Sequence, residues 1–332
     1  MKLLSIYSSN ICQKSEEHNT SISEGDYFYF EYGRYALGFL LREIKKKKAN
    51  DITILIPRFI CKDVIDSILL NGIKILFYEV NESLSPVIPD SLLRKVDLLL
   101  IVDYFGQSSE IDSFLNKSKE YDYEVIEDAA QSFLSRDDKG RDLGLRGHYG
   151  IFSYRKTLTI SCGASLFVSK DSGLQIGDDY VINPVLEVRD SKFKLRFLFK
   201  FIPPMIILLI LKMKRVLKSR NNSEFSKDYE VFSSIRGINI NVNKEFEKRR
   251  DLYIKVKNIV EYYGGEVIEG NLSQKGMPGG VVVKETGHRM CLLRPRLFLS
   301  GLELVKWPEF HELSSVNSEE FYGKVSFIPF IW

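Results

Sequence analysis

Two stretches near the middle of the chain decide the fold: Tyr123–Ser132 reads YEVIEDAAQS, and Tyr149–Val168 reads YGIFSYRKTLTISCGASLFV. Each begins with a short apolar run that is typical of a buried strand, and each has charged residues where that strand would end. Asp128 follows the first run, and Lys156 follows the second. Ligands bind beyond the carboxyl ends of strands in open parallel sheets, so both side chains are candidates for a binding site.

A carboxylate and a lysine at the ends of core strands suit a site for pyridoxal phosphate. The lysine would attach the cofactor, and the carboxylate would keep its ring nitrogen protonated, so that the ring accepts electrons. Neither residue is specific on its own. An aspartate at a strand end commonly caps a helix or turn, and a lysine there commonly faces solvent. Spacing and composition alone leave both interpretations open.

Apolar runs alternate with helix-like stretches on both sides of this region. We expect strands at 52–57, 73–80, 96–102, 123–127, 149–154 and 164–168, and helices at 35–48, 62–71 and 110–121. This alternation predicts an α/β fold with a doubly wound, mostly parallel sheet. We divide the 332 residues into a polar N-terminal arm (1–25), a large domain (26–190), a basic and apolar insertion (191–228) and a small α+β C-terminal domain (229–332). The last domain would begin with a helix near 245–263 and continue with short strands.

The composition excludes several classes of protein. With 47 basic and 44 acidic residues the formal charge is only +3, which is too weak to suggest nucleic-acid binding. The four cysteines, Cys12, Cys61, Cys162 and Cys291, form no CxxC pair and have no histidine cluster beside them. We therefore expect no disulfide framework, no metal site and a reducing cytoplasm. The N-terminus has no convincing cleavage pattern, so we expect no signal peptide.

Motifs along most of the chain resemble, in order, those of the DegT/StrS family of pyridoxal-phosphate sugar aminotransferases. VIEDAAQS and FSYRKTLTISCGA resemble the family's EDAAQ strand end and its lysine segment, and the spacing between them suits the family. YGRYAL at Tyr32–Leu37 resembles its phosphate loop. Weaker likenesses are ILIPRFICKDV, VDYFGQSSEIDSF, FEKRRDLY and LSGLELVKWPEF. The resemblance implies the fold of the type I pyridoxal-phosphate enzymes.

The resemblance also implies roles for single residues. Lys156 would carry the cofactor and move the proton, Asp128 would bind the ring nitrogen, and Gln131 would lie near the phenolic oxygen. The implied activity transfers an amino group from an amino acid, with glutamate as the expected donor, to a nucleotide-linked keto-sugar for surface polysaccharide synthesis. The implied assembly is a homodimer with its cofactor at the two-fold interface.

The phosphate of the cofactor would bind at the start of a helix. Gly33 and the amides of Arg34 and Tyr35 are the implied ligands, since helix N-terminal amides favour anions, and Ser153 would add a hydroxyl. Two features depart from the family here. Arg34 stands where threonine is usual, so its guanidinium would either pair with the phosphate or point to solvent. Ser153 lies three residues before Lys156 instead of five, which puts its role in question.

Other positions leave alternatives open. The residue that usually stacks on the cofactor ring aligns with Cys61, or with Phe59 if the alignment slips by two. Tyr104 and His148 could reach the site or simply pack. The chain ends at FIPFIW, where the family pattern continues, and the substrate-facing asparagine has only Asn239, beside Arg236, as a weak candidate.

These departures keep two other functions in view. One is a non-catalytic member of the family that acts in polysaccharide assembly. The other is sugar dehydration, although the family's dehydratases replace the lysine by histidine, whereas this chain has Lys156.

The insertion combines an apolar run with many cations. Residues 192–220 contain nine Lys or Arg and no acid, around the run FIPPMIILLILKM that begins at Phe201. The uncharged part is about half the ~20 residues that a membrane-spanning helix needs. The segment could lie on an anionic membrane surface, or it could pack on the protein or a dimer partner.

Overall fold

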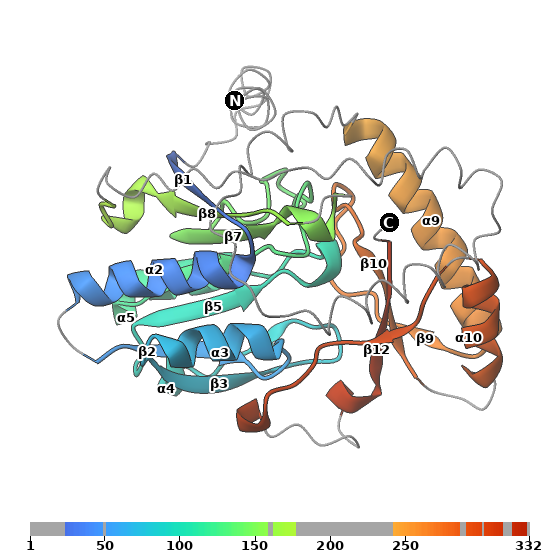
Figure 1. Ribbon diagram of the computed structural model, residues 1–332, viewed down its shortest axis with the longest axis horizontal. Helices are drawn as coiled ribbons and strands as arrows, with labels where there is room; N and C mark the ends of the chain where they lie inside the picture. Colours follow the sequence, from blue (N-terminus) through green and yellow to red (C-terminus); the bar gives the residue numbers. More distant parts are fainter. Residues whose placement is uncertain are drawn as a thin grey trace, which may run out of the picture.

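An eight-stranded mixed sheet forms the centre of the N-terminal part of the protein, in the order β1-β8-β7-β6-β5-β2-β3-β4 (Figure 1). The structure, a computed structural model, describes residues 24–48, 51–158, 162–176, 242–285, 290–300, 302–314 and 321–330. Most of the polar arm, the whole insertion at 191–228, and the weak candidates Arg236 and Asn239 therefore lie outside the described residues. The domain boundaries expected at residues 190 and 228 lie there too.

The sheet and its helices follow one another along the chain. The elements of this part are β1 (Gly25–Phe30), α2 (Gly33–Lys47), β2 (Thr53–Pro57), α3 (Lys62–Leu70), β3 (Lys74–Val80), β4 (Pro86–Val87), α4 (Asp90–Leu93), β5 (Leu98–Val102), η1 (Tyr104–Gly106), α5 (Asp112–Tyr121), β6 (Glu124–Asp128), β7 (Tyr149–Ser153), η2 (Tyr154–Lys156), β8 (Ala164–Ser169) and η3 (Lys170–Ser172).

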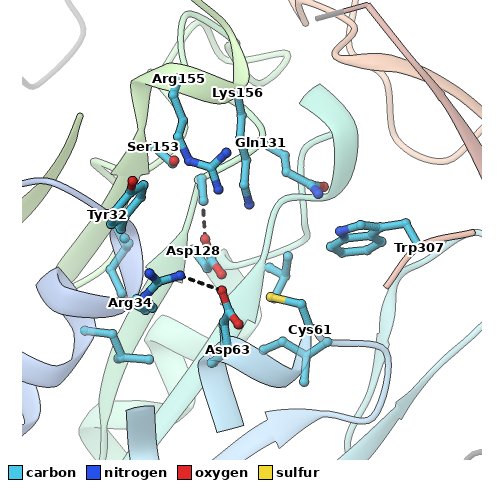
Figure 2. Close-up of a pocket in the computed structure, with 17 residues that line it drawn as sticks. Tyr32, Arg34, Cys61, Asp63, Asp128, Gln131, Ser153, Arg155, Lys156 and Trp307 are labelled. Atoms are coloured by element: carbon cyan, nitrogen blue, oxygen red, sulfur yellow. Dashed lines mark hydrogen bonds and ion pairs between the residues drawn. The ribbon is translucent and has the colours of Figure 1, made fainter. Parts of the chain in front are cut away.

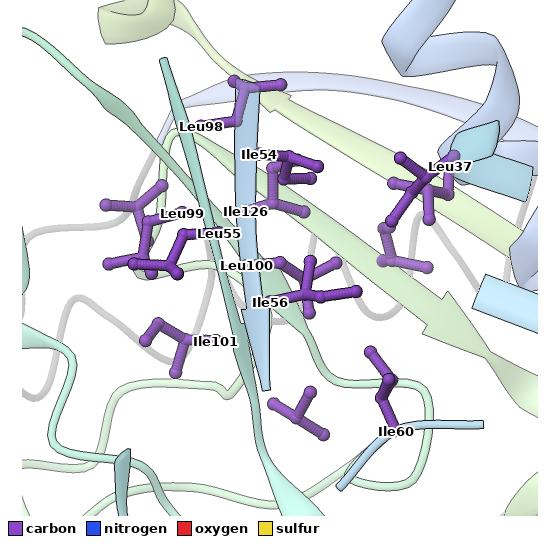
Figure 3. Packing of buried hydrophobic residues seen from close by; sticks show 14 of the residues in the cluster. Leu37, Ile54, Leu55, Ile56, Ile60, Leu98, Leu99, Leu100, Ile101 and Ile126 are labelled. Atoms are coloured by element: carbon purple, nitrogen blue, oxygen red, sulfur yellow. The ribbon is translucent and has the colours of Figure 1, made fainter. Parts of the chain in front are cut away.

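The central strands are apolar on both faces because helices cover both faces. Every residue of β5 is buried, and so are four of the five in β2. Figure 3 shows their side chains packed with Leu37 of α2 and Ile126 of β6. Right-handed crossovers place α3 and α5 on opposite faces, since β2 to β3 and β5 to β6 progress in opposite directions across the sheet.

The prediction of a mostly parallel α/β sheet is confirmed. Strands β7, β6, β5, β2 and β3 run parallel, whereas β8 is antiparallel to both of its neighbours, β7 and β1. The sequence reading placed no strand at β1. This segment is mostly half-buried and carries four consecutive aromatic residues, Tyr27–Phe30, which favour a strand. Its pairing with β8 places it at the edge of the sheet.

The C-terminal part has a second, antiparallel sheet in the order β11-β12-β10-β9. Its elements are α9 (Val242–Tyr262), β9 (Glu266–Val267), β10 (Gly280–Lys284), α10 (Met290–Leu299), β11 (Val305–Lys306), η6 (Glu312–Ser314), η7 (Phe321–Lys324) and β12 (Val325–Pro329). Helix α9 packs on this sheet through Tyr253, Val256 and Val260, which join a hydrophobic cluster of their own. The expected helix at 245–263 and the short strands are thus confirmed.

The strand order creates a crevice at one edge of the large sheet. From β2 the chain moves outward to β3, and it then returns past β2 to β5 and continues the other way to β6 and β7. The loops that leave β2 and β5 at their carboxyl ends therefore turn in opposite directions across the sheet. Such a switch point at the carboxyl ends of the strands is where α/β sheets bind ligands.

Candidate active site

A pocket lies at this crevice, between the ends of β5, β6 and β7 and the first turns of α2 and α3 (Figure 2). Six of the seven residues predicted for the site line it, namely Gly33, Arg34, Asp128, Gln131, Ser153 and Lys156. The seventh, Tyr35, does not. The fold thus brings together residues that lie more than a hundred positions apart in the sequence.

The register of the strands explains why Asp128 faces the pocket. In the ladder Val102 pairs with Asp128, and Asp128 pairs with Ile151, so these three side chains share one face of the sheet. All three line the pocket. Glu127, the preceding residue, points to the opposite face and is fully buried. A shift of one residue in β6 would exchange the two carboxylates.

Asp128 has one fixed hydrogen bond and one nearby cation. Its Oδ1 accepts the backbone N–H of Ala130 at 2.9 Å. Burial raises the pKa of Asp128, while the charge of Lys156 and the Ala130 amide oppose this rise. The carboxylate is therefore held in a partly buried place where a positively charged donor would stabilise its ionised form.

Lys156 lies at the end of the short turn that follows β7. Its side chain is half-buried, and it makes no hydrogen bond or ion pair with the described part of the chain. The turn itself is held firmly. The amide of Tyr154 donates to Gly163 at 2.9 Å, and Arg249 of α9 donates through Nη2 to the carbonyl of Thr157 at 2.7 Å. Gly163 has a φ of 137°, a conformation that favours glycine.

The first turn of α2 begins at the pocket. Tyr32 is its N-cap, and the Tyr32 carbonyl accepts the amides of Tyr35 (3.0 Å) and Ala36 (3.3 Å). The Tyr35 amide, one of the expected phosphate ligands, is therefore already used within the turn, and its side chain is 39% exposed. The amides of Gly33 and Arg34 precede it, where an α-helix has no internal acceptors for its N–H groups.

Arg34 does not simply point to solvent. Its Nη1 donates to Asp63 of α3 at 2.9 Å, and its guanidinium lies 4.6 Å from the centre of the Tyr32 ring. Arg155 approaches the same ring at 5.5 Å. The sequence reading gave no role to Arg155, Asp63 or Trp307, although all three line the pocket.

The structure also places the residues whose roles the sequence left open. Cys61 lines the pocket, whereas Phe59 is fully buried in an aromatic cluster with Tyr104 and Trp307. Burial raises the pKa of the Cys61 thiol. Tyr104 packs in that cluster and donates its hydroxyl to the Phe59 carbonyl at 2.6 Å. His148 lies at the other edge of the sheet, where its Nδ1 accepts the amide of Val125 at 3.0 Å.

Gln131 and Trp307 close the side of the pocket toward the C-terminal part (Figure 2). The Gln131 Oε1 accepts the amide of Phe105 at 3.3 Å. Trp307 comes from the segment after β11, so only the packing of the two parts brings it to the site. In the sequence, Trp307 was marked only as part of the segment LSGLELVKWPEF, which resembles a family motif.

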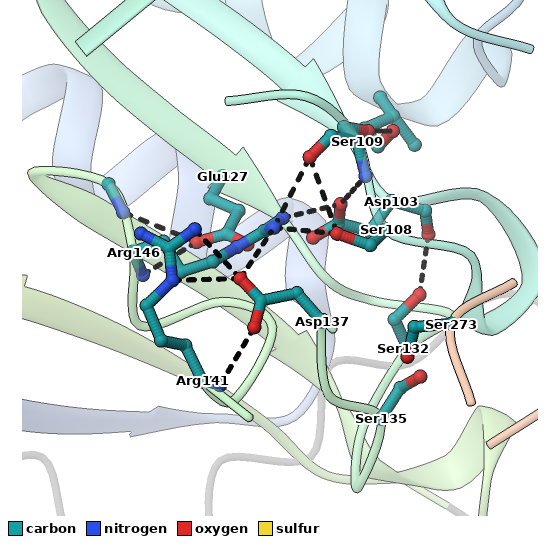
Figure 4. Close-up of polar contacts among 12 residues, drawn as sticks. Asp103, Ser108, Ser109, Glu127, Ser132, Ser135, Asp137, Arg141, Arg146 and Ser273 are labelled. Carbon is teal, nitrogen blue, oxygen red and sulfur yellow. Dashed lines mark hydrogen bonds and ion pairs between the residues drawn. The ribbon is translucent and has the colours of Figure 1, made fainter. Parts of the chain in front are cut away.

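A buried ionic network supports the ends of β5 and β6 from behind (Figure 4). Arg146, whose side chain is 2% exposed, donates to Glu127 at 2.7 Å and to Asp103 at 2.9 Å. Burial opposes ionisation of Glu127, but the charge of Arg146 holds the pKa of Glu127 below its usual value. Burial raises the pKa of Asp103 well above its usual range despite Arg146. The network therefore fixes the strand end that carries Asp128.

Two kinds of feature are absent from the described ranges. No helix there is long and apolar enough to cross a membrane. No group of three or more His, Cys, Asp or Glu side chains gathers there as a metal site would.

Sequence comparisons give a family match and relatives that match only part of the chain. Residues 34–175 match the model of the DegT/DnrJ/EryC1/StrS aminotransferase family. The chain is 25% identical over 173 residues to the putative pyridoxal phosphate-dependent aminotransferase EpsN of Bacillus subtilis, which covers 50% of this chain and 37% of that protein. It is 32% identical over 85 residues to the uncharacterized protein MJ1066 of Methanocaldococcus jannaschii, 26% of this chain and 22% of that protein. The matched stretches thus span well under half of either relative.

Solved structures share the fold at low sequence identity. The aminotransferase PseC of Helicobacter pylori, involved in the biosynthesis of pseudoaminic acid, has a TM-score of 0.62 and 14% identity, covering 98% of this chain and 84% of that chain. A DegT DnrJ EryC1 StrS aminotransferase from Brucella abortus has a TM-score of 0.59 and 13% identity, covering 98% and 88%. The expected fold of the type I pyridoxal-phosphate enzymes is confirmed by these likenesses.

Proposed function

We propose that the chain is a pyridoxal-phosphate-dependent sugar aminotransferase of the DegT/DnrJ/EryC1/StrS aminotransferase family, whose model residues 34–175 match. The observation that carries this proposal is that Lys156 and Asp128 line one pocket at the carboxyl edge of the sheet. A primary amine that forms no hydrogen bond or ion pair with the described residues, and a partly buried carboxylate, are the two groups that the cofactor requires of a protein.

The residues present fit the cofactor in three respects. Asp128 keeps a carboxylate oxygen beyond the one that accepts Ala130, so it can receive a pyridinium N–H. Apolar side chains, including Val102 and Ile151, supply walls for an aromatic ring. The start of α2 offers backbone amides and a favourable dipole to a phosphate. The donor set therefore matches a ring nitrogen, an aldehyde and a phosphate at different sides of one pocket.

When bound, pyridoxal phosphate supplies an electron sink that stabilises negative charge on the carbon of an attached amino acid. Lys156 would hold the cofactor through its amine and would serve as the base that moves a proton at the substrate carbon. Asp128 would keep the ring nitrogen protonated through a charge-assisted hydrogen bond. Gly33, Arg34 and Ser153 would bind the phosphate, and we assign Gln131 to the phenolic oxygen.

The proposal extends to the substrates of the reaction. We propose that an amino acid, with glutamate as the implied donor, gives its amino group to a nucleotide-linked keto-sugar. The motif resemblance implies a sugar substrate and a role in surface polysaccharide synthesis, and the fold is shared with PseC, an aminotransferase involved in the biosynthesis of pseudoaminic acid. We also propose a cytoplasmic homodimer, because aminotransferases of this fold commonly complete their sites across a two-fold interface.

A spectroscopic and labelling experiment tests the proposal. Purified protein mixed with pyridoxal phosphate should absorb in the visible, and borohydride should fix the cofactor on the peptide that contains Lys156. L-glutamate should then abolish the visible band and release its keto acid. Lys156→Ala is the negative control, and Lys170→Ala, at an exposed lysine paired with Glu24, is the matched surface control. Label on another lysine, or no response to any amino acid, would contradict the proposal.

The basic segment at 192–220 remains a prediction. We expect it to bind anionic vesicles in a manner that weakens with salt, because attraction between Lys or Arg and anionic headgroups is screened. Changing Met205, Ile206 and Leu209 to Ser should remove the binding that persists at high salt. Vesicle sedimentation measures both effects. If these changes instead dissociate or destabilise the protein and the parent never binds vesicles, the segment is a packing element.

A further inference from the structure

The charges that line the pocket are unequally matched. Three cations face it, Arg34, Arg155 and Lys156, but only two carboxylates, Asp63 and Asp128. Asp63 pairs with Arg34 at 2.9 Å, and Asp128 acts electrostatically with Lys156. Arg155 makes no hydrogen bond or ion pair within the part of the chain that the structure describes. It is the cation of this lining that has no counter-ion.

Arg155 and Arg34 converge on the same place. Their guanidinium carbons lie 5.5 Å and 4.6 Å from the centre of the Tyr32 ring. Tyr32 is the N-cap of α2, a helix of 15 residues, so both guanidinium groups are held next to its first free amides. Figure 2 shows Arg155 approaching from the turn after β7 and Arg34 from α2, with Tyr32 beside them. An aromatic ring can hold two guanidinium groups in this way through cation–π contacts.

A serine at the same position has a hydroxyl that forms no hydrogen bond with the described residues. Ser153 is 2% exposed and lines the pocket, yet its hydroxyl has no hydrogen bond to any described residue. Because Ser153 lines the pocket, its hydroxyl is free to form a hydrogen bond with a bound ligand. Two converging guanidinium groups, of which one is unpaired, indicate that the ligand is an anion.

We propose that Arg155 and Arg34 form a two-arginine clamp that binds the phosphate of the cofactor, together with Ser153 and the first amides of α2. The ligand identity rests on the proposed function, whereas the anion site rests on the contacts above. The clamp also accounts for the departures in the sequence. Arg34 replaces a threonine hydroxyl, and the position five before Lys156 is Ile151, which has none. Two guanidinium groups substitute for the two missing hydroxyl groups.

The ion pair with Asp63 is compatible with this role. Both side chains of the pair are substantially exposed, at 37% and 59%, so the pair is weak. A guanidinium has five N–H donors in a planar fork, and Arg34 can therefore hold Asp63 and a phosphate together or exchange one for the other. Asp63 thus orients Arg34 in the cofactor-free protein.

The phosphate could come from the cofactor or from the nucleotide of the substrate, and the experiment separates these sources. Calorimetry with the full-length, cofactor-free protein measures binding of inorganic phosphate, pyridoxal phosphate and UDP. Attachment of pyridoxal, which has no phosphate, is measured by borohydride trapping at Lys156. The variants are Arg155→Gln, Arg155→Lys and Arg34→Gln. Arg94→Gln is the matched control, since Arg94 is also exposed and lies 4.0 Å from a tyrosine ring, that of Tyr121, outside the pocket lining.

We expect Arg155→Gln and Arg34→Gln each to raise the Kd for inorganic phosphate and for pyridoxal phosphate about tenfold or more, because each removes a charge-assisted contact. Arg155→Lys should lose less, since it keeps the charge but not the fork. Attachment of pyridoxal should be unchanged in every variant, and Arg94→Gln should behave as the parent. Thermal melts of each variant confirm that it is folded.

Three outcomes would overturn the inference. Unchanged phosphate and pyridoxal phosphate binding in Arg155→Gln would remove Arg155 from the site. A loss confined to UDP would assign the clamp to the substrate. An equal loss for pyridoxal would show a structural effect. The proposed function fails separately: if pyridoxal never attaches at Lys156 while phosphate binding still depends on Arg155, the anion clamp stands without the aminotransferase.

Discussion

Replacement of Arg146 by methionine tests how much the buried network contributes to the protein that carries the site. Arg146 donates to Glu127, to Asp103 and to the Ser108 hydroxyl, at 2.7, 2.9 and 2.7 Å. Its side chain is 2% exposed and those of Glu127 and Asp103 are 0% exposed. Removing one partner of a buried ion pair costs about 3–5 kcal/mol, because the other charge stays buried without compensation.

The free energy of unfolding of the cofactor-free protein in urea measures this loss. Arg94→Met is the control: its pair with Glu120 is 59% and 64% exposed, so the expected change is at most about 1 kcal/mol. Adding Glu127→Gln to Arg146→Met should recover part of the loss, since the amide carries no charge to desolvate. The total stability of a domain is about 5–15 kcal/mol, so the variant should still fold at low temperature.

The pH dependence gives a second, independent readout of the same network. Without Arg146, burial would raise the folded-state pKa of Glu127 above its unfolded value. The unfolding free energy of the variant should therefore approach that of the parent as the pH falls, because protonation removes the uncompensated charge. A loss below about 1 kcal/mol at neutral pH, or a deficit that grows as the pH falls, would refute this reasoning.

The remaining predictions concern the site directly. Asp128→Asn should preserve the fold but slow the half-reaction with L-glutamate about a hundredfold or more, measured by stopped-flow absorbance, because a neutral amide no longer stabilises the protonated ring nitrogen; an equal rate would remove Asp128 from the mechanism. The charge of Lys156 lowers the pKa of Asp128, so Asp128 should have a higher pKa in Lys156→Ala than in Lys156→Arg. On acidification, the Ala variant should therefore lose noncovalent binding of the cofactor at a higher pH than the Arg variant. Loss of binding at the same pH in both variants would contradict this. Arg249→Met should remove the hydrogen bond to the Thr157 carbonyl and destabilise the turn by about 1.5–3 kcal/mol. An amine reagent should then label Lys156 more slowly in the cofactor-free protein, and Arg249→Lys should partly restore the rate. Unchanged labelling would assign Arg249 a purely structural role. Light scattering should give a dimer, and a fully active monomer would contradict the proposed assembly.

Local sequence patterns determined the elements of the large sheet. The expected strands at 52–57, 73–80, 96–102, 123–127, 149–154 and 164–168 agree with β2, β3, β5, β6, β7 and β8 to within two residues at each end. The agreement has a physical cause: a strand that is covered by helices on both faces must be a continuous apolar run, which the sequence shows directly. The residues that follow these runs, Asp128 and Lys156, were identifiable for the same reason: the end of a core strand is where a polar side chain first becomes tolerable.

Pairing and long-range contacts could not be obtained in this way. The strand β1 depends on its pairing with β8, and Trp307 reaches the pocket only because the C-terminal part packs against the sheet. Arg249 contacts Thr157 across a separation of 92 residues. These features come from the meeting of distant segments, and neither periodicity nor spacing records which segments meet.

The sequence by itself determined an α/β sheet whose strand ends carry a carboxylate and a lysine, because hydrophobic periodicity and chain direction are local properties. Only the tertiary structure decided which cations share the pocket. Arg34 and Arg155 are separated by most of the large domain in the sequence, yet both lie against the Tyr32 ring. Electrostatic interactions depend on distance and burial, and both are set by how the completed sheet orders its strands.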